Sequence, residues 1–473
     1  MTGNTHRTAP GSSDRDFGWL GIIRLGLVQT AIGAIVVLTT STLNRVMVVE
    51  LALPAALPGA LVGWHYAVQL ARPRFGYGAD RGGQRAPWIF GGMVVLGLGA
   101  VLATLAAMVM AGSALSGTAL AIFAFFLIGI GVGASGTNLL ALLATHTRPA
   151  RKAAAAAIVW IMMIVGFVLT AGIGGSLLDP FSMGRLLAVA SGIVAIAITV
   201  TGLALWGLEG RLQTQGSSSA AEPASEAAPA SKPDFRRAFR EVWADDQARR
   251  FTVFVFVSML AYSAQDLILE PFAGLVYDYT PGESTKLAGT QNSGVLLGMI
   301  LTALIGTTIG KSRAGFMRGW TVFGCVASAL ALGTLSIGAM VGPTWPLKPS
   351  VFALGLANGM FAVAAIGSMM TLASAGASSH AREGTRMGLW GAAQATAFGL
   401  GGFAGALAID VTRSLLGEIA PAFASVFAVE GGIFVIAAWL ALHVGRTDAD
   451  ERLLPAIPTG ETLIADQQPA LSS

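Results

Sequence analysis

The chain has few charged residues and a single cysteine. Only 11% of its 473 residues are charged and 54% are hydrophobic, whereas roughly a quarter of the residues in a soluble domain are charged. This composition excludes a water-soluble globular fold, because so much apolar surface needs lipid as its solvent. One cysteine, Cys325, excludes an internal disulfide framework and a cysteine metal cluster. It lies in an apolar run, so we expect it to pack in a core.

Signatures of targeting and catalysis are also missing. The segment Met1 to Asp16 is polar and lacks the short apolar stretch and cleavage site of a signal peptide. No Cys/His metal motif or Gly-rich phosphate loop occurs, and the close acidic clusters at 14–16, 245–246 and 448–451 lie in the tails or the linker. A membrane prenyltransferase would need clustered aspartates that hold magnesium and diphosphate. We therefore predict a protein that is not an enzyme, with no catalytic residues, no metal site and no nucleic-acid partner.

Apolar runs long enough to cross a bilayer are abundant. A span needs roughly 20 apolar residues to cross about 30 Å of hydrocarbon. Such runs lie near 25–49, 54–71, 88–111, 117–144, 154–178, 185–208, 251–276, 285–309, 316–341, 350–376, 385–410 and 420–444. The sequence thus predicts an all-α membrane protein with twelve transmembrane helices in two six-helix bundles.

The basic residues predict which way the helices face. If the amino terminus is cytoplasmic, the inner segments hold 24 of the 29 Lys and Arg residues. The outer loops then hold only Arg185, Lys286, Lys348 and Arg413, and Arg45 lies within a span. Positive charge concentrates on the cytoplasmic side of membrane proteins, so we expect both termini in the cytoplasm.

Composition divides the chain into five parts. We predict a cytoplasmic tail at 1–18, a bundle at 19–208, a cytoplasmic linker at 209–250, a second bundle at 251–445 and a cytoplasmic tail at 446–473. The linker begins as a flexible Ser/Ala/Glu/Pro-rich stretch. Its last part, 234–250, has apolar residues at helical spacing and arginines between them, which indicates an amphipathic helix. That helix either lies on the membrane surface or packs on the bundle.

Glycine is frequent, with 61 residues, and several glycines are spaced four apart. The pairs are Gly59 with Gly63, Gly129 with Gly133, Gly355 with Gly359 and Gly401 with Gly405. Small residues at this spacing let membrane helices approach closely. We predict that these pairs lie at helix contacts.

The loop after the second predicted span carries a charged motif. The chain reads GYGADRGGQR from Gly76 to Arg85, which resembles the signature loop of the major facilitator superfamily. That resemblance implies a latch on the cytoplasmic side of the two bundles, formed by Gly76, Asp80, Arg81, Gly83 and Arg85. The alternative is a basic inner loop without a latch role. A related segment, GTTIGKSR, follows the eighth span, as internal repeats of this superfamily predict.

Charged residues also occur within the predicted spans, where they are expensive unless paired or hydrated. The first span carries Asn44, Arg45 and Glu50, and the seventh carries Gln265, Asp266 and Glu270. Arg45 and Glu270 both lie roughly 30 Å from the cytoplasmic ends of their helices at 1.5 Å per residue. We hypothesise that Arg45 pairs with Glu270 or Asp266 and closes the outer side of a cavity. The alternatives are charges that snorkel to the outer interface, or a proton relay through Asp266 or Glu270.

Other polar and aromatic residues within the spans are candidates to line a cavity or bind a ligand. The cavity candidates are Gln291, Asn292, Asn358, Trp390 and Gln394. His65 stands between Trp64 and Tyr66, and an imidazole in this setting is a candidate ligand for the magnesium of a chlorin. Packing of these residues inside the bundle is the alternative interpretation.

Four segments together resemble one branch of the major facilitators, the bacteriochlorophyll delivery family of PucC and LhaA. They are LNRVMVVEL from Leu43, ARPRFGYGADRGGQRAPWI from Ala71, QDLILEPFAG from Gln265 and REGTRMGLWGAAQATAFGLGG from Arg382. The GGQRAPWI loop is shorter than in the antenna-assembly members, which suggests a sister branch associated with bacteriochlorophyll synthesis.

This resemblance implies a photosynthesis assembly factor in the inner, intracytoplasmic membrane. Such a protein binds bacteriochlorophyll or a precursor without a covalent cofactor. Its partners would be membrane lipid, light-harvesting antenna polypeptides, bacteriochlorophyll synthase or geranylgeranyl reductase. The competing hypotheses are an alternating-access transporter of a small amphipathic solute and a structural subunit of an enzyme.

Overall fold

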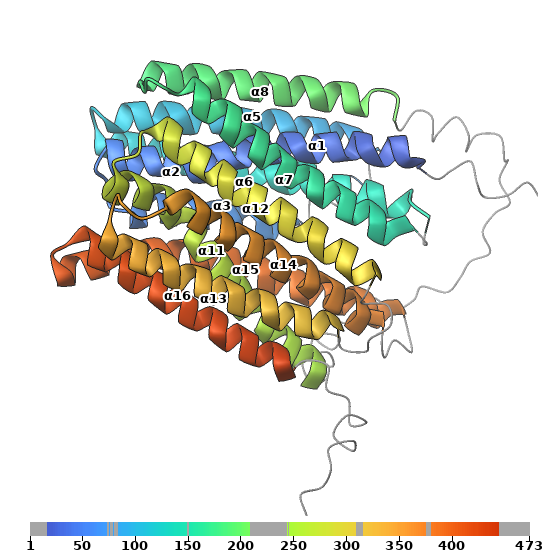
Figure 1. The fold of residues 1–473 in the computed structure, drawn as a ribbon. Coiled ribbons are helices and arrows are strands. Elements are labelled where there is room, and N and C mark those ends of the chain that lie inside the picture. Colours follow the sequence, from blue (N-terminus) through green and yellow to red (C-terminus); the bar gives the residue numbers. More distant parts are fainter. Residues whose placement is uncertain are drawn as a thin grey trace, which may run out of the picture.

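The computed structural model describes residues 17–72, 75, 79, 84–148, 151–208, 244, 246–308, 316–374 and 380–443. Within these ranges the side chains of 152–153, 247–248, 307–308, 317 and 366–392 are not described. The described residues form long helices joined by short turns (Figure 1).

The first half of the chain contributes the following helices. The first span is built from α1 Trp19–Val37, η2 Leu38–Thr42, α2 Leu43–Arg45 and η3 Val46–Glu50. It is followed by α3 Ala56–Val68 with η4 Gln69–Ala71, α5 Ala86–Met110, α6 Ala114–Thr145, α7 Lys152–Leu177 and α8 Met183–Leu205.

The second half contributes six helices of similar length. They are α11 Asp246–Tyr277, α12 Pro281–Thr308, α13 Phe316–Val341, α14 Leu347–Ser374, α15 His380–Leu416 and α16 Ile419–His443. All the predicted spans correspond to these elements. The predicted amphipathic helix at 234–250 lies mostly outside the described residues, and 246–250 form the first residues of α11.

Eleven helices of the described residues are long and apolar enough to cross a membrane. The remaining predicted span, 54–71, corresponds to the shorter pair α3 and η4. The amide of Phe17 donates to the carbonyl of His146 at 2.6 Å, so α1 begins beside the end of α6. Helix α6 therefore ends where α1 begins, and α5, which runs in the opposite direction, starts at that same end. Since α1 leads away from this end, the chain must return across the bundle between α1 and α5. The segment containing α3 makes this crossing.

The helix bundle has two ends, a terminal end and a far end. The terminal end holds the start of α1 and the end of α16, and the far end holds Glu50 and the connections α7–α8 and α11–α12 (Figure 1).

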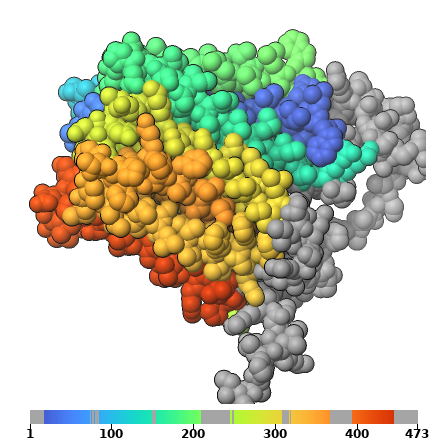
Figure 2. Space-filling view, in the orientation of Figure 1, coloured from blue at the N-terminus to red at the C-terminus, as the bar shows by residue number. Residues whose placement is uncertain are grey.

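The two halves repeat the same set of helix contacts. In the first half α1 packs on α7, α3 on α6 and α5 on α8; in the second half α11 packs on α15, α12 on α14 and α13 on α16. The halves meet where α7 contacts α12 and where α3 contacts α15. Figure 2 shows the blue-to-green half lying along the yellow-to-red half. Each half also has its own apolar core.

The predicted glycine pairs lie at helix contacts. A Cβ atom on Gly355 would overlap the carbonyl of Gln291, and one on Gly359 would overlap that of Val295, so α14 touches the backbone of α12. The other three pairs also face neighbouring helices. Cys325 is fully buried, as predicted.

Candidate functional site

A polar seam joins α1 and its continuation to α11, where the two halves meet. The Ser41 hydroxyl donates to the Glu270 carboxylate, and Asn44 Nδ2 donates to the backbone oxygen of Leu267 at 2.5 Å. All three side chains that contribute polar atoms are buried. The first and seventh spans, whose polar residues the sequence analysis singled out, therefore face each other and are joined by hydrogen bonds.

Arg45 lies in this seam but does not pair with the predicted acids. Its guanidinium is only 2% exposed, and Nη1 donates to Glu50 Oε1 at 2.5 Å. Nη2 donates to the backbone oxygen of Tyr279 at 2.5 Å, across the interface between the halves. The predicted direct ion pair of Arg45 with Glu270 or Asp266 was therefore wrong, although Arg45 interacts electrostatically with Glu270. The burial of Arg45 also excludes snorkelling to the surface.

The geometry of the first span explains why Glu50 is the partner. In a regular α-helix, residues five positions apart point in directions roughly 140° apart. The segment Val46–Glu50 is instead a π-helix, whose hydrogen bonds join residues five apart and place them on one face. A second π-turn, Leu38–Thr42, precedes Asn44. Such wide turns often mark functional sites, because they expose backbone groups and redirect side chains.

The far end of the interface is joined by two carboxylates. Asp179, after α7, accepts from the Thr280 hydroxyl at 3.0 Å and from Lys286 Nζ at 3.3 Å. Asp410 on α15 accepts from the amides of Ala55 and Ala56 at 3.0 and 2.7 Å. Both acids thus bind the start of a helix in the other half and hold the two halves together at the far end.

Asp266 lies in a different environment from Glu270. It is partly exposed, and it interacts electrostatically with Tyr66 and Tyr262. Both phenol rings contact Phe398 of α15, at centroid distances of 5.8 Å. Asp266 therefore faces an aromatic cluster between α3, α11 and α15. Its role in a proton relay stays a prediction, as does that of Glu270.

Several predicted cavity residues pack inside the bundle. Asn292 Nδ2 donates to the carbonyl of Ala288 in its own helix at 2.9 Å, and Gln394 Nε2 contacts Met259 Sδ at 3.9 Å. Gln291 is buried. The side chain of Trp390 lies outside the described residues.

His65 faces the first half and not an open cavity. The ring is buried, its Nε2 accepts from Gln69 Nε2 at 2.7 Å, and Tyr66 packs edge-on against it at 4.8 Å. Trp64 is exposed and stacks on Phe126 instead. Ligation of a chlorin magnesium by His65 would require α3 to move from α6, so it remains a prediction that this conformation does not favour.

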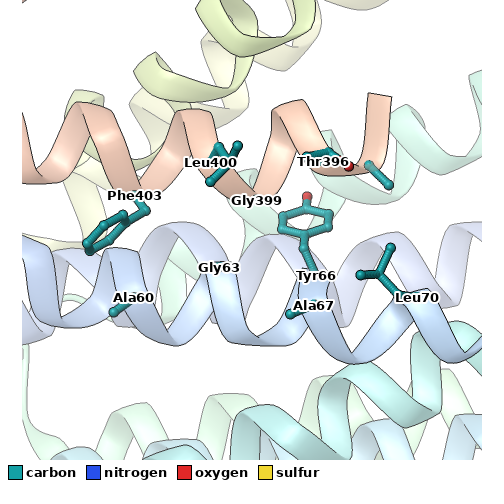
Figure 3. Close-up of a pocket in the computed structure, with 10 residues that line it drawn as sticks. Ala60, Gly63, Tyr66, Ala67, Leu70, Thr396, Gly399, Leu400 and Phe403 are labelled. Carbon is teal, nitrogen blue, oxygen red and sulfur yellow. The ribbon is translucent and has the colours of Figure 1, made fainter. Parts of the chain in front are cut away.

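A groove lies where α3 meets α15, between the two halves (Figure 3). Its volume is about 360 Å³. The lining is small or apolar apart from a phenol and a hydroxyl: Ala60, Gly63, Tyr66, Ala67, Leu70, Ala395, Thr396, Gly399, Leu400 and Phe403. Leu70 and Leu400 are 65% and 50% exposed, so the groove opens sideways toward lipid.

The predicted latch motif lies largely outside the described residues. This applies to Gly76, Asp80, Arg81 and Gly83, and to the related segment after the eighth span. Arg85 is described and immediately precedes α5. The latch therefore remains a prediction. Among the described residues, no group of three or more His, Cys, Asp or Glu side chains is arranged to hold a metal ion.

Three acids escaped the sequence prediction. Asp179 and Asp410 have no neighbouring motif, although each lies near the end of an apolar run. Glu430 stands in the middle of the last span, and its charge within apolar residues was a signal of the same kind as Arg45.

Comparisons with known proteins show the family of this chain. Residues 42–449 match the family model described as PUCC protein. The chain belongs to the PucC family. It is 51% identical over 445 residues to the "Bacteriochlorophyll synthase 44.5 kDa chain" of Rhodobacter capsulatus, covering 94% of this chain and 99% of that protein. It is 28% identical over 458 residues to "Protein PucC" of Cereibacter sphaeroides, covering 92% and 94%.

Solved structures show the fold of this PucC-family chain. A bacterial homologue of the human lysosomal transporter Spinster superposes with a TM-score of 0.64 at 19% identity, covering 94% of this chain and 100% of that one. The peptide transporter POT in complex with sulfate superposes with a TM-score of 0.65 at 14% identity, covering 92% and 96%. The predicted major facilitator fold and the predicted family are confirmed, and the chain is a multi-pass membrane protein.

Proposed function

We propose that this protein is a non-enzymatic carrier that holds bacteriochlorophyll or a precursor for the assembly of photosynthetic complexes. The observation that carries the proposal is the lipid-facing groove between α3 and α15, in a chain whose relatives are named for PucC and for bacteriochlorophyll synthesis. The partner would be an antenna polypeptide or a late pigment enzyme, and the location would be the photosynthetic inner membrane.

The groove suits the hydrocarbon tail of such a pigment better than its ring. A volume of about 360 Å³ is at the lower end of the range for sites that enclose a drug-sized ligand. A tetrapyrrole ring with its tail is larger than such a ligand. Gly63 and Gly399 leave the floor without side chains, and Leu400 and Phe403 form apolar walls. In this proposal the tail enters from the bilayer and the ring stays at the mouth.

The polar groups give the groove a direction. Tyr66 and Thr396 lie toward the end of α3 that leads to the terminal end, whereas Ala60 and Phe403 lie toward the far end (Figure 3). A hydroxyl beside an apolar channel is suited to hydrogen-bond the ester that joins a tail to its ring. The ring would then lie nearer the terminal end.

The experiment fills the groove. Ala67 is exposed and lines it, so Ala67→Trp places an indole in the channel without replacing a core residue. Ala195 on α8 is also exposed but lies on another helix, so Ala195→Trp is the matched control. Both variants and the unaltered protein are produced in a bacteriochlorophyll-synthesising host, purified in mild detergent and compared by absorption spectroscopy.

We expect the unaltered protein and Ala195→Trp to carry pigment. Ala67→Trp should carry about tenfold less, which corresponds to a loss of about 1.4 kcal/mol in binding free energy. Absence of pigment from the unaltered protein would contradict the proposal. Equal amounts of pigment in all three proteins would show that the protein binds pigment at a place other than this groove.

A second candidate is an alternating-access transporter of a small amphipathic solute. The far end favours it, because Asp179 and Asp410 hold together two halves that a transporter must separate. Solute uptake into vesicles containing the purified protein, with no pigment bound, would support this function over the first.

A further inference from the structure

A layer of buried polar side chains crosses the core of the second half. It contains one residue from each of four helices: Gln265 on α11, Ser328 on α13, Asn358 on α14 and Glu430 on α16. All four are at least 97% buried. These helices pack against one another, so the layer is internal to this half and separate from the α1–α11 seam and from the groove.

Phenylalanines bracket Glu430 along α16. On the far side, Phe272 contacts Phe427 at a centroid distance of 5.0 Å. On the terminal side, Phe361 contacts Phe434 at 6.0 Å. Glu430 lies between Phe427 and Phe434 on the same face of α16, because residues three and four apart share a face. The layer is therefore closed above and below by aromatic rings.

Helix register and contacts place the other three residues. Asn358 is one turn from Phe361, and its Oδ1 accepts from the Ser328 hydroxyl at 2.9 Å. Gln265 is fully buried on α11, and its neighbour Asp266 interacts electrostatically with Glu430.

Most polar atoms of the layer have no hydrogen-bond partner among the described residues. The unpartnered atoms are both carboxylate oxygens of Glu430, both amide atoms of Gln265 and Nδ2 of Asn358. A buried polar atom without a partner is strongly unfavourable. Asn358 and Ser328 are joined by a hydrogen bond, whereas the unpartnered atoms of Gln265, Asn358 and Glu430 form none with one another. A species bound between them would supply the missing partners.

The charge of the layer indicates what that species is. Two other titratable groups lie near the layer. Asp266 interacts electrostatically with Glu430, and Cys325 on α13 lies one turn from Ser328. In the described part of the helices packed against α16, no Lys, Arg or His lies at this depth. A carboxylate in such a place requires a positive charge. The available ligands are carboxylate, amide and hydroxyl oxygens, which suit hard cations.

We infer that this layer is a binding site for a monovalent cation, held by Glu430 with Gln265, Asn358 and Ser328 around it. Either an alkali-metal ion or a proton supplies the positive charge. Asp266, next to Gln265 on α11, is partly exposed and forms the route toward the interface between the halves. This inference does not depend on the binding of pigment.

The test measures thermal unfolding of the full-length protein in detergent by tryptophan fluorescence. A cation that binds only the folded state raises the folding equilibrium constant about a hundredfold when it is present at about 100 times its Kd. We expect the midpoint to rise with NaCl but not with choline chloride if the cation is a metal ion. It should rise as the pH falls, at constant salt, if the cation is a proton.

Three variants decide between a site and a packing feature. Glu430→Gln keeps the shape of the side chain. It should abolish the dependence on Na⁺, or remove the part of the pH dependence that Glu430 contributes beside Asp266 and Glu270. Gln265→Leu should weaken that dependence without removing the charge. Glu418→Gln, an exposed acid at the start of the same helix, should leave it unchanged. The same dependence in Glu430→Gln as in the unaltered protein, or no dependence in either, would overturn the inference.

Discussion

Asp179 and Asp410 occupy equivalent positions in the two halves, and each carboxylate binds the start of a helix in the opposite half. Asp179 follows α7 and binds at the start of α12, whereas Asp410 near the end of α15 binds the first amides of α3. The pair α7 and α12 corresponds to the pair α15 and α3 in the repeat. Both carboxylates are also favoured by the positive ends of the helix dipoles.

Neutralising these acids should loosen the far end. A carboxylate at a helix amino terminus contributes about 1 kcal/mol, so Asp410→Asn and Asp179→Asn should each raise the opened population about fivefold. The measurement is alkylation by a membrane-impermeant maleimide of a cysteine introduced at the buried Thr42, in a chain that also carries Cys325→Ala. Glu418→Gln is the control, and unchanged labelling in both Asp variants would contradict the role of the clamps.

Arg45 and Glu50 should behave as one unit. Removing one partner of a buried ion pair leaves the other uncompensated. Because Glu50 is 32% exposed, we expect Arg45→Ala to lower the free energy of unfolding by about 2–3 kcal/mol and Glu50→Ala by about 1 kcal/mol. The double variant should cost less than the sum of the two, measured by thermal unfolding. Additive losses would mean that the pair contributes nothing as a pair.

The contact between α12 and α14 should tolerate no added side chain. Gly355→Ala places a methyl group against the Gln291 carbonyl, and such overpacking costs about 1–3 kcal/mol. Gly432 on α16 has open space around it, so Gly432→Ala should leave stability unchanged or raise it by up to about 1 kcal/mol through helix propensity. Equal unfolding midpoints for the two variants would refute the close approach.

Cys325 should report unfolding without any engineering. Its thiol is completely buried, so a thiol-reactive fluorophore should react slowly with the folded protein and quickly once α13 separates from its neighbours. The expected result is a single labelling transition on heating that coincides with the loss of native tryptophan fluorescence. Rapid labelling at low temperature would contradict the burial.

The spans and their order could be predicted from the sequence because apolar length and spacing are properties of each segment alone. The runs near 117–144 and 420–444 correspond to α6 and α16 within a few residues. The glycine pairs were also identifiable, since contact between backbones requires small residues wherever the partner helix lies.

The partner of Arg45 could not be predicted in this way. Spacing of five residues places Arg45 and Glu50 on different faces of a regular helix, and only the π-turn brings them together. Asn358 was likewise a candidate to line a cavity, whereas the packing of α14 turns it into the core of the second half.

By itself the sequence determined that this protein is embedded in a membrane, how many apolar runs it contains and which family its motifs resemble. Only the tertiary structure decided which polar groups meet. The physical reason is that burial in lipid follows from the composition of one segment, whereas a hydrogen bond or an ion pair needs two atoms within about 3 Å. That distance depends on the rotation of each helix and on the helices packed beside it.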